Sequence, residues 1–332
     1  SQSASSGSNT AGVLFGGTTT AYVAVTEEYN KSTNVITNGA WASGPSTNTA
    51  RRGANFGGVG SNTAGLYFGG VTGPGPTSNA TEEYNGSAWT NSNNYPISAQ
   101  NIGSAGTQTA AIGFGGAIPP YSAVAADYDG SSWTAITSMP TATWQPAGTG
   151  TQTAALATGG STLAAASVTQ TLEWDNSSWT SGGALSTGRR YFSGFGSQTD
   201  SVAPGGTSAP DAILSSTEEY GGSSWTSGNN MISTIRAHAT STQSSSSAGM
   251  DINGTLNNSN SSNRTFTYDG TTWSANASTA TDRLEASAIG ASTAAMVIGG
   301  VAPWPSPGAV VSTTEQFTAG TTTTNITDFT TS

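Results

Sequence analysis

A pair of glycines following a short apolar run recurs at nearly constant intervals along this 332-residue chain, and an Asn-Gly pair fills one place in the series. A period of roughly forty to fifty residues is the size of one four-stranded blade of a β-propeller. The repeat therefore predicts an array of similar β-units from one end of the chain to the other. The seven pairs are Gly16-Gly17, Gly69-Gly70, Gly115-Gly116, Gly159-Gly160, Gly205-Gly206, Asn253-Gly254 and Gly299-Gly300.

Two columns of aromatic residues run in phase with these pairs. The first column is Tyr29, Tyr84, Tyr128, Trp174, Tyr220, Tyr268 and Phe317. In the five central repeats a tryptophan follows after five residues, at Trp89, Trp133, Trp179, Trp225 and Trp273. In the first and last repeats the second aromatic, Trp41 or Phe329, follows after twelve residues, so we expect a longer loop there. Bulky rings at equivalent positions would fill the wedges between neighbouring blades.

Turn signals separate the two aromatic columns. Asn85-Gly86, Asp129-Gly130 and Asp269-Gly270 lie between the paired aromatics, and Asn-Gly and Asp-Gly join antiparallel strands tightly. Strand-length segments rich in β-branched and aromatic residues precede these turns, and no window has sustained helical periodicity. The pattern predicts a four-stranded meander in each repeat and essentially no helix.

We therefore predict an all-β fold, a seven-bladed β-propeller of four-stranded antiparallel blades that occupies residues 1–332 as one domain. Each blade is expected to come from contiguous sequence, with no strand exchanged. The ring is then expected to close by packing of the last blade against the first. The expected blades are approximately 1–49, 50–98, 99–141, 142–187, 188–234, 235–281 and 282–332.

The glycine pair after an apolar strand, followed by a Tyr and then a Trp, resembles the kelch repeat family, and the resemblance covers essentially the whole chain. It implies kelch-like blades. The segments Thr-Glu-Glu-Tyr-Asn-Gly-Ser-Ala-Trp-Thr at 81–90 and Thr-Gln-Thr-Ala-Ala at 107–111 also resemble the Ser/Thr/Gly-rich kelch-like proteins of marine bacteriophages. That second resemblance implies a virion protein.

Composition excludes several classes of partner. Only 8% of the residues are charged, with eight Lys plus Arg and a formal net charge of −10. So few cations cannot neutralise a phosphate backbone or an anionic membrane surface, so we expect no nucleic acid partner. No stretch approaches eighteen consecutive apolar residues, so we expect no membrane insertion. Zero Cys excludes disulfides and thiolate metal sites.

The candidate catalytic and metal groups are few. Kelch-type propellers include galactose oxidase, and that resemblance would imply copper held by two His and two Tyr, with a Cys cross-linked to one Tyr. This chain has His238 alone and no Cys, so we expect no such site, no other metal and no cofactor. His238 is expected to be a surface or packed residue, and a single His gives a Ser-His-Asp triad almost no support.

Carboxylates and arginines recur with the repeat rather than as isolated pairs. Glu83 and its counterparts precede the column aromatic, and Glu82 and its counterparts lie one residue earlier. A glycosidase needs two carboxylates at one cleft, whereas repetition spreads these around a ring. The arginines Arg51, Arg52, Arg189, Arg190, Arg236 and Arg283 cluster where inner strands begin. We expect ion pairs between strands or blades, with an arginine cluster that binds a carboxylated sugar as the alternative.

The aromatics outside the two columns predict a ligand-binding face. Loops between second and third strands share a face with the connections between blades, and several leftover rings lie in these segments. Rings beside Asn, Ser and Thr suit carbohydrate binding, because they stack on the apolar faces of sugars. The alternative is that Pro-flanked rings only cover their own loops. The candidate ligand-binding residues are Trp304, Tyr121, Tyr22, Tyr95 and Trp144.

The functional prediction is a non-enzymatic extracellular or virion-surface module. It would decorate a particle or fibre, or attach to a host by binding a receptor or cell-surface glycan, with other virion or surface-assembly proteins as partners. A nearly uncharged Ser/Thr surface fits a particle in salt, where charge-based adhesion is screened. The alternatives are a carbohydrate-active enzyme of the propeller type and a protein-binding kelch adaptor.

Overall fold

The computed structural model describes residues 4–7, 11–18, 22–30, 35–36, 39–56, 58–73, 75–118, 120–256, 260–303, 308–320, 322–323 and 329–331. The chain divides into two compact units, one of residues 40–319 and one formed by residues 1–39 with 320–332. The described residues form strands, bridges and turns without a helix, as the sequence predicted. No helix among them is long and apolar enough to cross a membrane.

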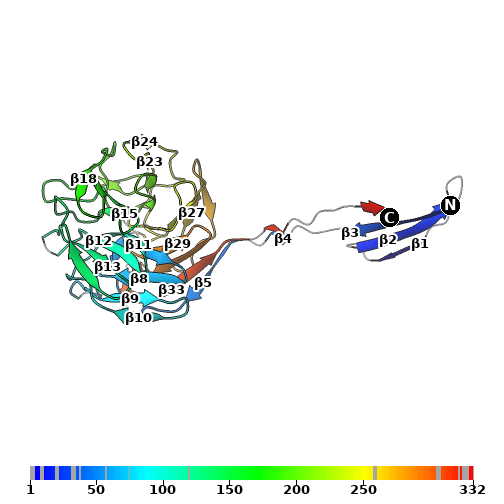
Figure 1. Cartoon of the computed structure of the whole chain (residues 1–332), viewed down its shortest axis with the longest axis horizontal. Coiled ribbons are helices and arrows are strands. Elements are labelled where there is room, and N and C mark those ends of the chain that lie inside the picture. The colour runs from blue at the N-terminus through cyan, green and yellow to red at the C-terminus, as the bar shows by residue number, and fades with distance from the viewer. Residues whose placement is uncertain are drawn as a thin grey trace. The chain divides into compact units, whose positions relative to one another are not determined.

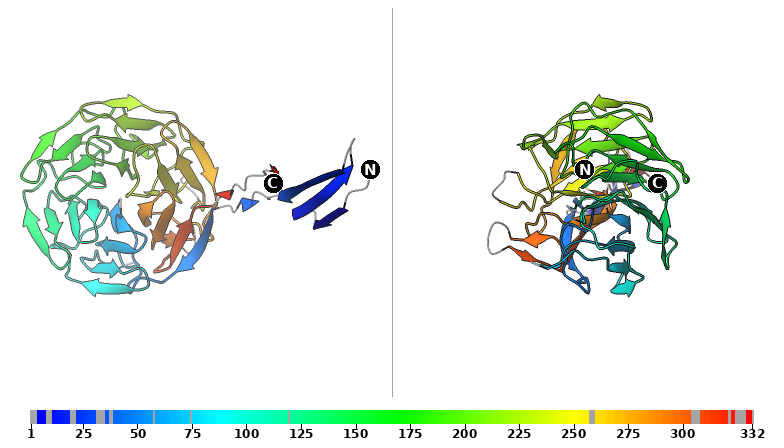
Figure 2. Two further views of the ribbon diagram at one scale, coloured as in Figure 1. Left: turned by 45° about the vertical axis from the view of Figure 1, so that its right-hand side comes forward. Right: turned by 90° about the vertical axis from the view of Figure 1, so that its left-hand side faces the viewer.

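The larger unit is a β-propeller of four-stranded antiparallel sheets arranged around a centre (Figures 1 and 2). We number its blades in chain order, each from inner to outer strand. Blades 1 to 3 consist of β7 (Val59–Ser61), β8 (Ala64–Phe68), β9 (Thr81–Tyr84) and β10 (Trp89–Ser92); β11 (Ile102–Thr107), β12 (Ala110–Phe114), β13 (Ala125–Tyr128) and β14 (Trp133–Ile136); and β15 (Ala147–Gly150), β16 (Ala155–Thr158), β17 (Thr171–Trp174) and β18 (Trp179–Ser181).

The other three blades follow the same order, and short hairpins extend two of them. Blades 4 to 6 consist of β19 (Phe195–Gly196), β20 (Ser201–Pro204), β23 (Thr217–Tyr220) and β24 (Trp225–Ser227); β25 (Ala239–Thr240), β26 (Gly249–Ile252), β27 (Thr265–Tyr268) and β28 (Trp273–Asn276); and β29 (Ser287–Ala291), β30 (Ala294–Ile298), β33 (Thr314–Thr318) and β5 (Ala40–Gly44). The extra strands are β6 (Asn55–Phe56), parallel to β11, with the hairpins β21 (Thr207–Ser208)–β22 (Ala212–Ile213) and β31 (Val301–Ala302)–β32 (Ala309–Val310).

The ring of described residues closes with six blades, where the sequence led us to expect seven. Inner strand β29 of blade 6 contacts inner strand β7 of blade 1. The Ser287 hydroxyl also donates to the Asn55 carbonyl across this junction, at 2.9 Å. The other inner strands also contact their neighbours, and between blades 4 and 5 the Thr240 hydroxyl of β25 donates to the Gly194 carbonyl beside β19. The ring therefore has no place for another blade.

The outer strand of blade 6 corrects the expected blade boundaries and the expectation that no strand is exchanged. β5 pairs antiparallel with β33, with Trp41 opposite Phe317. A strand from near the start of the chain therefore forms the outer strand of the last blade. Residues 1–49 do not form one blade by themselves, although the sequence had led us to expect this. The pairing satisfies the backbone of β33 that would otherwise be an open sheet edge.

The smaller unit, described by itself, is one more four-stranded sheet. Its strand order is β1 (Ala4–Gly7), β2 (Ala11–Thr18), β3 (Tyr22–Asn30) and β35 (Phe329–Thr331). A two-residue pairing of β4 (Val35–Ile36) with β34 (Thr322–Thr323) belongs to the same unit. We call the four-stranded sheet the terminal sheet, and it corrects the expectation of a single domain over 1–332.

The aromatic columns fill the propeller as predicted. In all six blades the third-strand aromatic lies directly opposite the fourth-strand aromatic, with ring centroids between 4.8 and 5.3 Å apart. Both glycines of a pair adopt positive φ, for example 70° at Gly69 and 96° at Gly70. Asn253, at φ 61°, takes the place of the first glycine in blade 5, which fits the tolerance of Asn for this region.

Tyrosine hydroxyls link neighbouring blades. Tyr128 of blade 2 donates to the carboxylate of Glu83 in blade 1, and Tyr220 of blade 4 donates to Glu173 in blade 3. Tyr268 of blade 5 does the same to the carboxylate that precedes the aromatic of blade 4. These carboxylates therefore join blades, which agrees with the expected structural role of the repeated acids.

Candidate ligand-binding site

Six equivalent residues form an inner ring where each blade begins, and all six have left-handed φ values between 52° and 57°. Backbone N–H groups connect members of successive blades: Asn101 donates to Gly53, Gly53 to Glu285, Glu285 to Ala237 and Ala237 to Tyr191, over 2.6–3.0 Å. Side-chain-bearing residues adopt this conformation only where the surrounding structure imposes it. The members of the inner ring are Gly53, Asn101, Gln145, Tyr191, Ala237 and Glu285.

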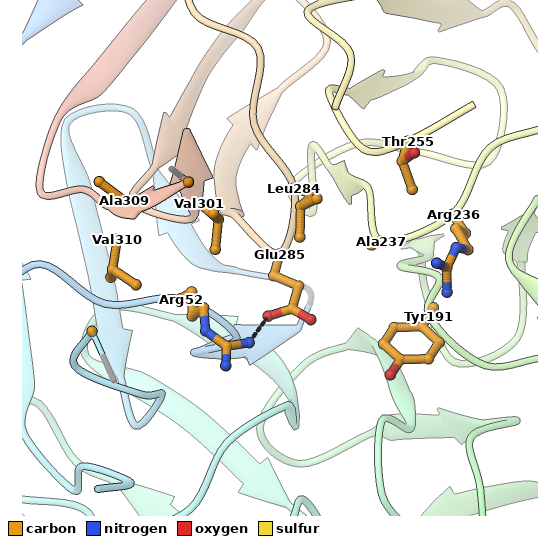
Figure 3. A pocket seen from close by; sticks show the side chains of 12 residues that line it. Arg52, Tyr191, Arg236, Ala237, Thr255, Leu284, Glu285, Val301, Ala309 and Val310 are labelled. Carbon is orange, nitrogen blue, oxygen red and sulfur yellow. Dashed lines mark hydrogen bonds and ion pairs between the residues drawn. The ribbon is translucent and has the colours of Figure 1, made fainter. Parts of the chain in front are cut away.

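A cavity of about 720 Å³ opens beside this ring (Figure 3). A volume of this size is in the range of small-molecule sites. Inner-ring residues, the residues just before them and the β31–β32 hairpin build its walls. The described lining consists of Arg52, Gly73, Tyr191, Arg236, Ala237, Thr255, Leu284, Glu285, Val301, Gly308, Ala309 and Val310.

Two arginines line the cavity, and their electrostatic situations differ. Arg52 Nη1 lies 2.5 Å from Glu285 Oε2, so its charge is compensated. Arg236 has no carboxylate within ion-pair distance and no side-chain hydrogen bond among the described residues, and its Nε is buried without a partner. Its guanidinium lies 5.4 Å from the centre of the Tyr191 ring. The described cavity wall therefore holds one guanidinium without a carboxylate partner.

An aromatic run leads to the cavity. Tyr121, between the second and third strands of blade 2, stacks on Trp144 with centroids 5.6 Å apart. Trp144 in turn meets Tyr191 edge to face at 5.5 Å. The Trp144 indole N–H donates to Asn101 Oδ1 of the inner ring, at 3.2 Å. Tyr121, Trp144 and Tyr191 are all half-buried, so each retains exposed surface.

Tyr191 connects the aromatic run to the charges. Burial raises the pKa of its phenol, the nearby Glu285 carboxylate raises it further, and Arg190 and Arg236 oppose the shift. Tyr191 therefore stays protonated at neutral pH and its hydroxyl remains a hydrogen-bond donor. Arg190 also lies over this ring, at 5.6 Å, but it forms an ion pair with Asp211.

The predicted ligand-binding residues have different outcomes. Tyr121 and Trp144 stack on each other, and neither is among the described residues that line the cavity. Tyr95 is a correction: it is 1% exposed and packs on Phe68 with centroids 5.2 Å apart, so it is a core residue rather than part of an open face. Tyr22 begins strand β3 of the smaller unit, and Trp304 lies outside the described residues.

The arginines at the blade starts divide into two groups. Arg51, Arg189 and Arg283 are fully buried and form ion pairs with Glu82, Glu218 and Glu315, which confirms the expected pairing between strands. Arg52 and Arg236 come one position after the buried residues Arg51 and Ile235 of their blade starts, and both line the cavity instead (Figure 3). The sequence pattern grouped all of these arginines together, so the alternative of an arginine cluster that binds a carboxylated sugar included Arg236 but did not single it out.

The histidine is packed inside blade 5. His238 Nδ1 contacts Asp251 Oδ2, and both side chains have no exposed surface. Burial raises the pKa of the Asp251 carboxyl, against the opposing charge of His238. The pair occupies positions that hold apolar residues in other blades, such as Ala286 and Val297 in blade 6. His238 does not line the cavity.

The described lining of the cavity is mostly uncharged. Glu285 is the one carboxylate among the described lining residues, and the described part of the chain holds no group of three His, Cys, Asp or Glu that could bind a metal. A free guanidinium, aromatic surface and hydroxyl groups are the elements with which proteins bind a polar ligand that carries an anionic group.

Comparison with known proteins supports the β-propeller fold. The solved structure of YjhT, a kelch-repeat protein, is similar, with a TM-score of 0.67, 13% sequence identity, and coverage of 85% of this chain and 99% of that one. At this identity the likeness concerns the fold alone. No family model and no curated protein matches the chain.

Proposed function

We propose that this propeller is a non-enzymatic recognition module of an extracellular or virion surface, and that its cavity binds a carbohydrate carrying a carboxylate. The observation that carries the proposal is the guanidinium of Arg236, which lies in the cavity wall beside Tyr191 without a carboxylate partner among the described residues. A half-buried cation of this kind gains most from an anion that enters the cavity.

The aromatic run supplies the second part of recognition. Pyranose rings present apolar C–H faces that stack on Tyr and Trp, and their hydroxyls need hydrogen-bond partners. Trp144, held by its indole N–H on Asn101, offers a fixed surface between Tyr121 and Tyr191. Tyr191 contacts Trp144 at 5.5 Å and Arg236 at 5.4 Å, so a sugar held beside Tyr191 would have its carboxylate near the guanidinium.

The same geometry favours binding over glycoside hydrolysis. Hydrolysis requires two carboxylates at one cleft, one of which acts as a general acid. Glu285, the one carboxylate in the described lining, is held at 2.5 Å by Arg52. The described lining offers no second carboxylate with which Glu285 could share such a mechanism.

The proposed location on an extracellular or virion surface is supported by the amino-acid composition. Only 8% of the residues are charged, and a polar but weakly charged surface changes its interactions little with salt. This suits a decoration or fibre protein that meets host glycans, as the resemblance to kelch-like proteins of marine bacteriophages implies. Other surface-assembly proteins would then be its structural partners.

A glycan array with the full chain tests the proposal. We expect binding to glycans with uronic or other carboxylated sugars, and loss of that binding in Arg236→Ala. The matched control is Arg264→Ala, because Arg264 is exposed, has no carboxylate partner among the described residues and does not line this cavity. Binding of neutral glycans only, or carboxylate binding that survives Arg236→Ala, would contradict it. Binding only to a protein partner would favour the adaptor alternative.

A further inference from the structure

The terminal sheet has the strand register of a propeller blade. In blade 1, Gly65, Leu66, Tyr67 and Phe68 lie opposite Tyr84, Glu83, Glu82 and Thr81. In the terminal sheet, Gly12, Val13, Leu14 and Phe15 lie opposite Tyr29, Glu28, Glu27 and Thr26. The outer strand matches as well, because Phe329 lies opposite Tyr29 as Trp89 lies opposite Tyr84. The glycine, the two glutamates and the tyrosine are thus the same residue types at the same register.

Blade 6 and the terminal sheet have exchanged their outer strands. In the central repeats the third strand pairs with the next strand along the chain, as β9 does with β10. Here β3 pairs with β35, and β33 pairs with β5. The twelve-residue spacing of the aromatics in both repeats accompanies this exchange. The terminal sheet therefore has the four strands of a complete seventh blade, and the ring closes between β29 and β7 without it.

A blade of this kind is covered on both faces within the ring. Leu66 of blade 1 belongs to one hydrophobic cluster with Ile102 of blade 2. Its neighbour Tyr67 belongs to another cluster, with Ile289 of blade 6. Leu66 and Tyr67 are both at most 1% exposed. By register, Val13 and Leu14 therefore occupy the positions that face a following and a preceding blade.

The positions that form hydrogen bonds between neighbouring blades are also present in the terminal sheet. In the ring, the carboxylate of Glu83 accepts from Tyr128 of the following blade, and the Tyr84 hydroxyl accepts from Gln316 of the preceding blade. The terminal sheet carries Glu28 and Tyr29 at these two register positions. A glutamate on one face and a tyrosine on the other are complementary head to tail.

We propose that the terminal sheet is a seventh blade that packs head to tail against the terminal sheet of a second copy of this chain. The face with the Val13 and Glu28 positions in one copy meets the face with the Leu14 and Tyr29 positions in the next. A four-stranded sheet with two blade-type faces needs covering layers for independent stability. The closed six-bladed ring offers no gap for it, whereas the same sheet in another copy has the matching faces.

Mass photometry and sedimentation of the full chain over a wide range of concentration test this assembly. We expect oligomers that Val13→Asp and Leu14→Asp each weaken by about 100-fold or more, since each places a charge in a dry contact. Thr180→Asp, at an exposed position of β18 in the propeller, is the matched control and should leave assembly unchanged. A chain that stays monomeric at every concentration overturns the proposal.

A mixing experiment separates the proposed contact from misfolding of the variants. Val13→Asp damages one face of the terminal sheet and Leu14→Asp damages the other. Each variant alone is expected to be monomeric, but an equimolar mixture has one intact pair of faces and should form heterodimers and nothing larger. Absence of heterodimers in the mixture, or oligomers that survive in either variant alone, contradicts head-to-tail packing.

Discussion

Arg189 Nη2 lies 2.6 Å from Glu218 Oε1 inside blade 4, and the two side chains are 0% and 3% exposed. The guanidinium also donates to the backbone carbonyls of Ala203 and Gly205, and the carboxylate accepts from the backbone N–H of Ser186. Blades 1 and 6 repeat this arrangement. The pair therefore joins the start of a blade to its own second and third strands.

The other three blades lack both the buried arginine and the buried glutamate. Blade 5 has Ile235 and Phe266 at the two positions, and both are buried. Replacing Arg189 by Ile or Glu218 by Phe alone should cost about 3–5 kcal/mol, because one buried charge loses its partner. The double variant should recover most of that loss. Denaturant unfolding of the three variants checks this, and equal destabilisation by the double variant and the sum of the singles would contradict it.

Tyr220→Phe should reduce the free energy of unfolding by about 1–2 kcal/mol, because it removes the hydroxyl that donates to Glu173 of blade 3. Burial and this hydrogen bond raise the pKa of Tyr220 to about 12. Tyr95→Phe is the control, since the Tyr95 hydroxyl is buried without a partner in the described structure, and it should be neutral or stabilising. Thermal unfolding compares the two, and an equal loss in both would argue against the interblade bond.

Asp127 of blade 2 should make stability fall as pH rises. It occupies the position of Glu83 and Glu173, but the next blade has Trp174 where four of the other blades have Tyr, so no phenol can donate to it. Burial raises its pKa from 3.8 to about 6. The folded state therefore holds this proton more tightly, and its contribution is lost between pH 3.8 and about 6.

Asp127→Asn should remove that component of the pH dependence and stabilise the protein at pH 7. Stability measured by denaturant unfolding between pH 4 and 7 in both proteins provides the comparison. The difference between them should grow with pH and level off above about 6. A constant difference across this range would show that the carboxyl does not titrate as described.

The repeat pattern was sufficient to predict the propeller, because the glycine pairs and aromatic columns act within each blade. Their contribution to the turns and packing of one blade does not depend on which strand completes which sheet. The number of blades depends on pairings between distant segments, such as β5 with β33. The twelve-residue interval before Trp41 was visible in the sequence, but a longer loop and a strand exchange give the same interval.

The site was predictable only in part, for the same kind of reason. Trp144 and Tyr121 lie in connections on the face that carries the cavity, so their convergence follows from topology. Tyr95 lies in a similar connection, yet its ring enters the core against Phe68. Arg51 and Arg52 are neighbours in sequence, and only the backbone direction at the blade start sends one to Glu82 and the other to the cavity.

Calorimetric titration with a panel of uronic acids, each paired with its neutral parent sugar, tests the central claim most directly. We expect at least one uronic acid to bind the full chain about 10-fold or more tighter than its parent, since a charge-assisted bond to Arg236 is available only to the acid. Arg236→Ala should abolish that difference, and Trp144→Ala should weaken acid and parent alike. Equal affinity for acid and parent in every pair, or a preference that Arg236→Ala leaves intact, would contradict the account.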